Sequence, residues 1–263
     1  MALAVLRSGA GPRLVLVHGF TQTARSWAAV QQHFASEYEV IAVDAPGHGG
    51  SHHLDADLWT AARLVVEAGG EATYVGYSMG ARIVLHAALA HPESVRRVVL
   101  LGATPGLRTE AERAVRRTSD EELARSLESD GLESFLERWL ANPLFAHLDV
   151  GASNVEDRLR NSVEGLASCL RNTGTGRQDD LWPRLASLRM PALLMAGSLD
   201  TKFAAIAGQM AHAIGTNATR VLVAGAGHAA HLERAEEFCA VLEQWLRESD
   251  QAPSASPIPK ANP

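Results

Sequence analysis

Short apolar runs alternate with amphipathic stretches through the first hundred residues. The apolar runs are rich in valine and span residues 14–18 (LVLVH), 40–44 (VIAVD), 73–77 (TYVGY) and 97–102 (RVVLLG). Runs of this kind are typical of parallel strands buried on both faces. The stretches between them, such as 26–37 and 58–69, have the periodicity of amphipathic helices. The pattern predicts an α/β fold with a mostly parallel central sheet flanked by helices, and the first few residues predict a short edge strand.

This alternation stops after the fourth run. Residues 105–188 contain only helical patterns, and apolar runs return at 191–197 (PALLMAG) and 219–225 (TRVLVAG). We therefore expect a core formed by residues 1–104 and 189–248, with residues 105–188 inserted as a helical cap. The final stretch, 249–263, is rich in proline, alanine and serine and predicts a disordered tail.

Composition narrows the class of protein. The chain has 263 residues, 46% of them hydrophobic, and a net charge of −6, which argues against non-specific nucleic-acid binding. We expect neither a membrane span nor a secretory signal, because no apolar run is long enough for either. The two cysteines, Cys169 and Cys239, lie far apart and are expected to be buried free thiols. A cytoplasmic location is the resulting expectation.

The most informative short motif is GYSMG at residues 76–80. It lies between a predicted strand and a predicted helix, where a G-x-S-x-G turn exposes the serine hydroxyl at the carboxyl edge of the sheet. The two glycines leave room for the tight backbone. The motif predicts that Ser78 is a catalytic nucleophile or base instead of a structural turn serine.

An activated serine needs a histidine and an orienting acid. In a fold of this kind the acid and then the histidine follow the serine along the chain, in loops after later strands. Asp200 comes directly after the run 191–197, and His228 follows the glycine-rich turn after 219–225. His231 falls in the first turn of the next helix and is the weaker candidate. We expect a catalytic triad of Ser78, Asp200 and His228.

Stabilisation of an oxyanion needs two hydrogen-bond donors aimed at one point. The backbone N–H groups of Phe20, in the HGF stretch after the first long strand, and Met79, directly after the serine, are the candidates. His18 is expected to shape that loop, and Asp44 and His48 to form a turn after the second strand.

These motifs together resemble the α/β-hydrolase fold over about residues 3–247. Further stretches, including GYSMGAR, ERWLANPLF and LRNTGTGRQDDLWPRLASLRMPALLMAGSLDTKF, are similar to the 2-succinyl-6-hydroxy-2,4-cyclohexadiene-1-carboxylate synthases of menaquinone biosynthesis. The resemblance implies a lyase. It would eliminate pyruvate from 2-succinyl-5-enolpyruvyl-6-hydroxy-3-cyclohexene-1-carboxylate, with the triad removing a proton alpha to the succinyl ketone.

That substrate carries three carboxylates, whereas the chain is net acidic, so cations must be concentrated near the serine. Arg82 lies one helical turn after Ser78 and would be costly in an apolar helix unless paired or facing a cleft. The resemblance assigns further substrate-binding positions to Arg116, Arg160, Tyr77 and Trp139. A solvated helix face is the alternative for Arg116 and Arg160, a structural ion pair for Arg82, and core packing for Trp139.

Two other functions remain open on the residues alone. A carboxylesterase or carbon–carbon bond hydrolase would use the same triad with Ser78 as nucleophile, and a hydrolase-fold receptor would bind a small ligand without turnover. Converging arginines would favour the multi-carboxylate substrate over an apolar ester. No dinucleotide, P-loop or metal-ligand spacing is present, so we expect neither a metal nor an organic cofactor.

Overall fold

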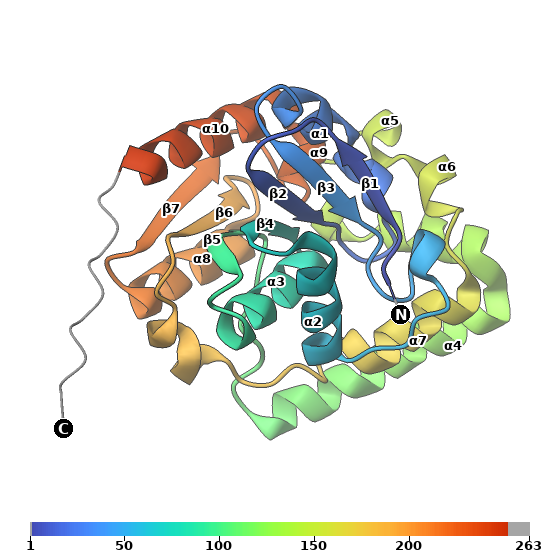
Figure 1. Ribbon diagram of the computed structural model, residues 1–263. Coiled ribbons are helices and arrows are strands. Elements are labelled where there is room, and N and C mark those ends of the chain that lie inside the picture. Colours follow the sequence, from blue (N-terminus) through green and yellow to red (C-terminus); the bar gives the residue numbers. More distant parts are fainter. Residues whose placement is uncertain (1, 252–263) are drawn as a thin grey trace.

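The computed structural model describes residues 2–251, which form one twisted sheet covered by helices on both faces (Figure 1). The sheet has seven strands in the order β1-β3-β2-β4-β5-β6-β7, and only β1 is antiparallel to its neighbour. The strands are β1 Val5–Ser8, β2 Arg13–Val17, β3 Glu39–Val43, β4 Ala72–Tyr77, β5 Val95–Leu101, β6 Ala192–Gly197 and β7 Ala218–Val223. The predicted α/β fold is confirmed, and so is the edge strand at the N-terminus.

Alternate side chains of the strands enter two separate cores, as the two-residue period of a strand requires. Val15 and Val17 of β2 pack under α2 (Leu58–Gly69), α3 (Met79–Ala90) and α8 (Thr201–Ile214). Leu14 and Leu16 face the opposite side, against Phe238 and its neighbours. That second side is covered by η1 (Ala24–Trp27), α1 (Ala28–Phe34), α9 (Ala230–Glu233) and α10 (Ala235–Gln251).

The elements between β5 and β6 are all helical. They are α4 Glu110–Leu140, η3 Pro143–Phe145, α5 Val150–Ser153, α6 Val155–Arg158, α7 Val163–Thr173 and η4 Trp182–Ser187, and a further short turn, η2 Gly49–Ser51, follows β3. The helices α4 and α7 run side by side and share their own apolar cluster (Figure 1). Helix α4 bends at Gly131, whose φ of 80° is open to glycine at little cost.

Packing near residue 188 bears on one end of the predicted insertion. Leu181, Leu185 and Leu188 belong to the same buried cluster as the α8 side chains, so the last part of segment 105–188 packs as core. That the remainder acts as a separate cap stays a prediction.

The predicted start of the tail at residue 249 is wrong. Residues 249–251 complete helix α10, because its helical pattern continues past the predicted boundary, and residues 252–263 lie outside the described part of the chain. Among residues 2–251, no helix is both long enough and apolar enough to cross a membrane.

Candidate active site

Ser78 occupies the sharp turn between β4 and α3. Its backbone has φ 51° and ψ −107°, a conformation that is rare for a residue with a side chain and is typical of strained functional positions. The flanking glycines permit the turn. A Cβ atom on Gly80 would collide with the carbonyl oxygen of Val17, and one on Gly76 would lie 2.5 Å from the Cα of Ala81.

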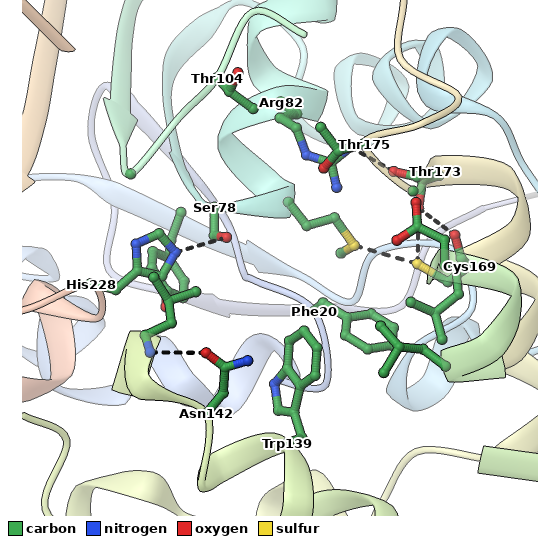
Figure 2. Close-up of a pocket in the computed structure, with 18 of the residues that line it drawn as sticks. Phe20, Ser78, Arg82, Thr104, Trp139, Asn142, Cys169, Thr173, Thr175 and His228 are labelled. Carbon is green, nitrogen blue, oxygen red and sulfur yellow. Dashed lines mark hydrogen bonds between the residues drawn. The ribbon is translucent and has the colours of Figure 1, made fainter. Parts of the chain in front are cut away.

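The serine hydroxyl is connected to an acid through one histidine (Figure 2). His228 Nε2 lies 3.1 Å from Ser78 Oγ, and His228 Nδ1 lies 2.7 Å from Asp200 Oδ2. The carboxylate can only accept, so Nδ1–H donates to it and Nε2 is left to accept the serine proton. Asp200 is also the N-cap of α8, where its Oδ1 accepts from the backbone N–H of Phe203 at 3.1 Å. One carboxylate therefore fixes both the imidazole and the start of a helix.

The other histidine candidate has a different environment. His231 is buried against the rings of Trp27 and Tyr77, with both centroid distances 4.4 Å. Neither of its ring nitrogens has a hydrogen-bond partner among the described residues. Burial lowers the pKa of His231 well below its ordinary value, and the nearby charge of Arg158 lowers it further. His231 is thus a neutral ring in the core and is not hydrogen bonded to Ser78.

Two more buried histidines hold the loops behind the serine. His18 Nδ1 donates to the carbonyl of Gly19, and its Nε2 accepts from the N–H of Ala45 at 3.0 Å. His48 Nε2 accepts from the N–H of Thr21 at 3.3 Å. Burial lowers the pKa of His18 to about 4 and that of His48 to about 3, so both are neutral at pH 7. Their contacts are those of loop-shaping side chains.

The turn after β3 is held in the same way. Asp44 accepts from the backbone N–H groups of Ala24 and Gly50 at 2.7 and 2.8 Å. Neither Asp44 nor His48 lines the cavity at Ser78.

The two residues predicted to supply oxyanion donors both lie at that cavity. Met79 is the first residue of α3, and the N–H at this helical position has no acceptor within its own helix. Phe20 lies in the loop after β2, and both residues line the cavity beside Ser78. Their role as oxyanion donors stays a prediction.

The cavity at Ser78 has a volume of about 460 Å³, within the range of small-molecule sites. It lies between the carboxyl edge of the sheet and the inserted helices. Apolar and aromatic side chains form much of its wall. Among residues 2–251, four cations reach it: Arg82, Arg116, Arg158 and Lys202. Among residues 2–251 we find no group of three or more histidine, cysteine or acidic side chains arranged to hold a metal ion.

Two of the predicted arginines line this cavity. Arg82 is only 8% exposed and donates from Nη1 to the carbonyl of Thr173 at 2.6 Å. Burial, and then the charge of Arg116, lower the pKa of Arg82 to about 10, so it remains a cation at pH 7. Arg116 donates from Nε to Asp120 Oδ1 at 2.7 Å, and the buried Asp120 also accepts from the N–H of Gly176. These contacts hold the two guanidinium groups at the cavity wall.

The prediction for Arg160 is wrong in position. Its side chain is 52% exposed, lies 3.6 Å from Asp157 Oδ1, and lines a separate surface hollow beside Arg25 and Asp44. Arg158 occupies the cavity wall instead. Arg158 is the last residue of α6, whereas Arg160 lies in the turn that follows it.

Arg158 is held as firmly as Arg82. It is buried, its Nε donates to the carbonyl of Ser153 at 2.7 Å, and its Nη1 donates to the hydroxyl of Thr21. Burial lowers its pKa, and the neighbouring Tyr77 and Asp157 oppose that shift.

The two predicted aromatic residues also reach the cavity. The Tyr77 ring lies 5.3 Å from that of His228, and burial raises the pKa of its hydroxyl, so it stays protonated. Trp139 packs 5.2 Å from Phe20 and 6.0 Å from Phe135, and its indole N–H has no partner among the described residues. Trp139 therefore contributes both to packing of the inserted helices and to the cavity wall.

Sequence reasoning missed Arg158 and Lys202. The RLR pair at residues 158–160 signals two candidate arginines, but nothing in one sequence says which of them faces inward. Lys202 had a clearer signal, since it is one of only two lysines in the chain and follows the triad acid by two residues.

Comparisons with known proteins agree with this geometry. The model of the alpha/beta hydrolase fold family matches residues 12–235. Proteins named 2-succinyl-6-hydroxy-2,4-cyclohexadiene-1-carboxylate synthase from Escherichia coli O1:K1 and Salmonella agona (strain SL483) are each 33% identical over 244 residues. These matches cover 90% of this chain and 94% of each relative.

Solved structures give the same result. MenH from S. aureus is similar with a TM-score of 0.87 and 30% identity, covering 95% of this chain and 99% of that chain. A Thermogutta terrifontis esterase has a TM-score of 0.81 at 21% identity, covering 94% of this chain and 93% of that chain, and shares the fold alone. The chain belongs to the α/β-hydrolase fold family and, within it, to the 2-succinyl-6-hydroxy-2,4-cyclohexadiene-1-carboxylate synthases.

Proposed function

We propose that this protein is a carbon–oxygen lyase that eliminates pyruvate from 2-succinyl-5-enolpyruvyl-6-hydroxy-3-cyclohexene-1-carboxylate. The observation that carries the proposal is that the Ser78–His228–Asp200 chain opens into a cavity lined by Arg82, Arg116 and Arg158. A neutral ester would not need this concentration of positive charge. A substrate with three carboxylates would, in a chain whose net charge is −6.

The first step is removal of a proton. Ser78 Oγ, as its proton passes to His228 Nε2, takes the ring hydrogen alpha to the succinyl ketone. The electron pair of the broken C–H bond forms an enolate, whose oxygen is stabilised by the Phe20 and Met79 amides. Asp200 stabilises the imidazolium that results.

The second step expels the leaving group. The enolate electrons return through the ring double bond, which shifts, and the ring carbon–oxygen bond to the enolpyruvyl group breaks. The departing enolpyruvate takes up a proton and becomes pyruvate, while the ring keeps two conjugated double bonds. No covalent bond to Ser78 is required, so the serine acts as a base.

The cations supply binding and orientation. Guanidinium groups stay charged and form two parallel hydrogen bonds to a carboxylate, which fixes its orientation as well as its position. Arg82 and Arg158 are already held by backbone carbonyls, so little side-chain freedom is lost when substrate binds.

The reaction belongs to menaquinone biosynthesis, and we place it in the cytoplasm. Both Cys169 and Cys239 are free buried thiols, in keeping with a reducing compartment.

The test is pyruvate release from the purified protein, beside hydrolysis of a short-chain nitrophenyl ester. We expect rapid pyruvate release that Ser78→Ala reduces by about 10³-fold, in the range of general-base catalysis. Brisk ester hydrolysis without pyruvate release would instead establish the runner-up, a carboxylesterase or carbon–carbon bond hydrolase that uses Ser78 as a nucleophile.

A further inference from the structure

Lys202 is a cation at the cavity that the reaction steps above do not use. It is the second residue of α8, it is exposed, and it lines the cavity at Ser78. A positive charge in the first turn of a helix is opposed by the helix dipole, so Lys202 does not stabilise the helix that carries it. The ion pairs among the described residues, such as Arg116–Asp120, do not include it.

Its place relative to the triad is set by Asp200. The carboxylate that orients His228 also caps α8, so the helix start and the imidazole are fixed to each other. Phe203 packs 4.5 Å from the His228 ring, and the Lys202 ammonium lies 5.3 Å from the Phe203 ring centroid. The ammonium is therefore on the His228 side of the serine.

Arg82 lies on a different side of the serine. Figure 2 shows Ser78 between His228 and Arg82, which point toward the cavity from different directions. The cavity thus has positive charge at three places: Arg82 of α3 near Arg116, the buried Arg158 of α6 against Thr21, and the exposed Lys202 of α8.

The proposed substrate has a matching arrangement. Its succinyl and enolpyruvyl groups are on ring carbons 2 and 5, which are opposite each other in a six-membered ring. Their carboxylates therefore extend in opposite directions from the carbon that loses its proton. Of these groups, only the enolpyruvyl one leaves in the reaction.

We propose that Lys202 binds the carboxylate of the departing three-carbon group, while the buried arginines hold the carboxylates that remain on the ring. The inference rests on the proposed elimination. An exposed ammonium on a flexible stem suits a group that must reach solvent after the bond breaks. Arg82 and Arg158 donate to backbone carbonyls and are fixed in position. They therefore suit the carboxylates on the ring, which must stay in place during the reaction.

The experiment compares inhibition by the two products in the wild type and in Lys202→Met. Turnover is followed by the absorbance of the conjugated diene, so pyruvate can be added freely as an inhibitor. In Lys202→Met we expect the inhibition constant of pyruvate to rise about tenfold and the KM for substrate to rise severalfold. The inhibition constant of the diene product should change less than about twofold, and Lys202→Arg should restore most pyruvate binding.

Two controls separate the possible failures. Arg125→Met removes an exposed cation of α4 that pairs with Glu121 and lies outside the cavity, and it should change neither constant. An unchanged pyruvate constant in Lys202→Met, or a rise in the diene-product constant alone, would overturn the assignment while elimination by the wild type persists. A wild type that forms no diene would overturn the proposed function itself, and with it the inference, before any variant is made.

Discussion

The sheet edge and the inserted helices contribute to the same cavity by different means. Ser78, Asp200 and His228 lie in the turns that follow β4, β6 and β7, which meet at one edge of the sheet. Arg116 and Arg158 come from the insertion, where side-chain contacts to Asp120 and Thr21 hold them in place. The comparison shows that the reacting groups depend on strand geometry, whereas the binding groups depend on individual hydrogen bonds.

The largest expected effect is on turnover after substitution of Asp200, whose carboxylate contacts both His228 and the backbone of α8. Asp200→Asn keeps an oxygen for the Phe203 N–H but presents an N–H group to His228 Nδ1, which forces the wrong imidazole tautomer. Pyruvate release should fall by about 10³-fold.

Asp57→Asn is the matched control for that change, because Asp57 caps α2 through the Thr60 N–H and contacts no catalytic group. It should leave turnover within about twofold, since the amide oxygen still caps the helix. If both variants lose activity equally, helix capping and not imidazole orientation is what Asp200 supplies.

A second prediction concerns the tight turn. Gly80→Ala places a methyl group against the carbonyls of Val17 and His18, and we expect the free energy of unfolding to fall by about 2–3 kcal/mol. Gly151→Ala, in the inserted α5, meets no atom within 4 Å and should change stability by less than about 1 kcal/mol. Urea denaturation of both variants measures the difference, and equal losses would contradict the close packing assigned to the elbow.

A third prediction separates the two arginines of the insertion. Arg158→Met should raise the KM for the tricarboxylate about 10- to 100-fold, because it removes charged hydrogen bonds in a buried wall. Arg160→Met should change KM less than about twofold, since Arg160 is exposed on another hollow. Steady-state kinetics on the two variants measure both KM values. A larger rise in KM for Arg160→Met than for Arg158→Met would favour the substrate-binding role predicted for Arg160 from the sequence.

The last prediction needs no substitution and concerns the dependence of stability on pH. His18, His48 and His86 have pKa values of about 4, 3 and 4, lowered mainly by burial from the ordinary 6.5. Above pH 6.5 they are neutral in both the folded and the unfolded chain and contribute no pH dependence. Below pH 6.5 the unfolded chain binds protons that the folded chain rejects, so stability is lost as the pH falls toward 4.

Each histidine should contribute a slope of about 1.4 kcal/mol per pH unit in that window. Chemical denaturation at pH 7, 6 and 5 measures the slope. Replacing the exposed His53 by Gln should leave it unchanged, and a flat profile between pH 6.5 and 5 would contradict the neutral buried state of these rings.

The same contrast explains how much of the site the sequence could predict. Ser78, Asp200 and His228 follow runs of apolar residues, and a run of apolar residues locates a strand end to within a residue or two. The carboxyl ends of parallel strands meet at one edge, so the three residues could be assembled without coordinates. The α/β fold and the order of its elements follow from the same runs.

In the inserted helices, no comparable sequence pattern shows which charged residue faces the cavity. Arg158 and Arg160 are both plausible on charge, and only the docking of α6 against Thr21 decides which one faces the serine. The position of Lys202 at the cavity depends on where Asp200 starts α8. The helix α10 continues to Gln251, past the boundary predicted at residue 248, because the proline-rich composition of the segment begins only after it.

The most direct test of the central claim is the ratio of kcat/KM for the tricarboxylate to that for a neutral nitrophenyl ester, in the wild type and in Arg82→Met. Arg82 is positioned by α3 and the Thr173 carbonyl, not by the triad. Its loss should therefore lower the ratio about 10- to 100-fold while ester turnover changes little. An equal loss on both substrates would contradict the division between a reacting sheet edge and a charge-selective wall.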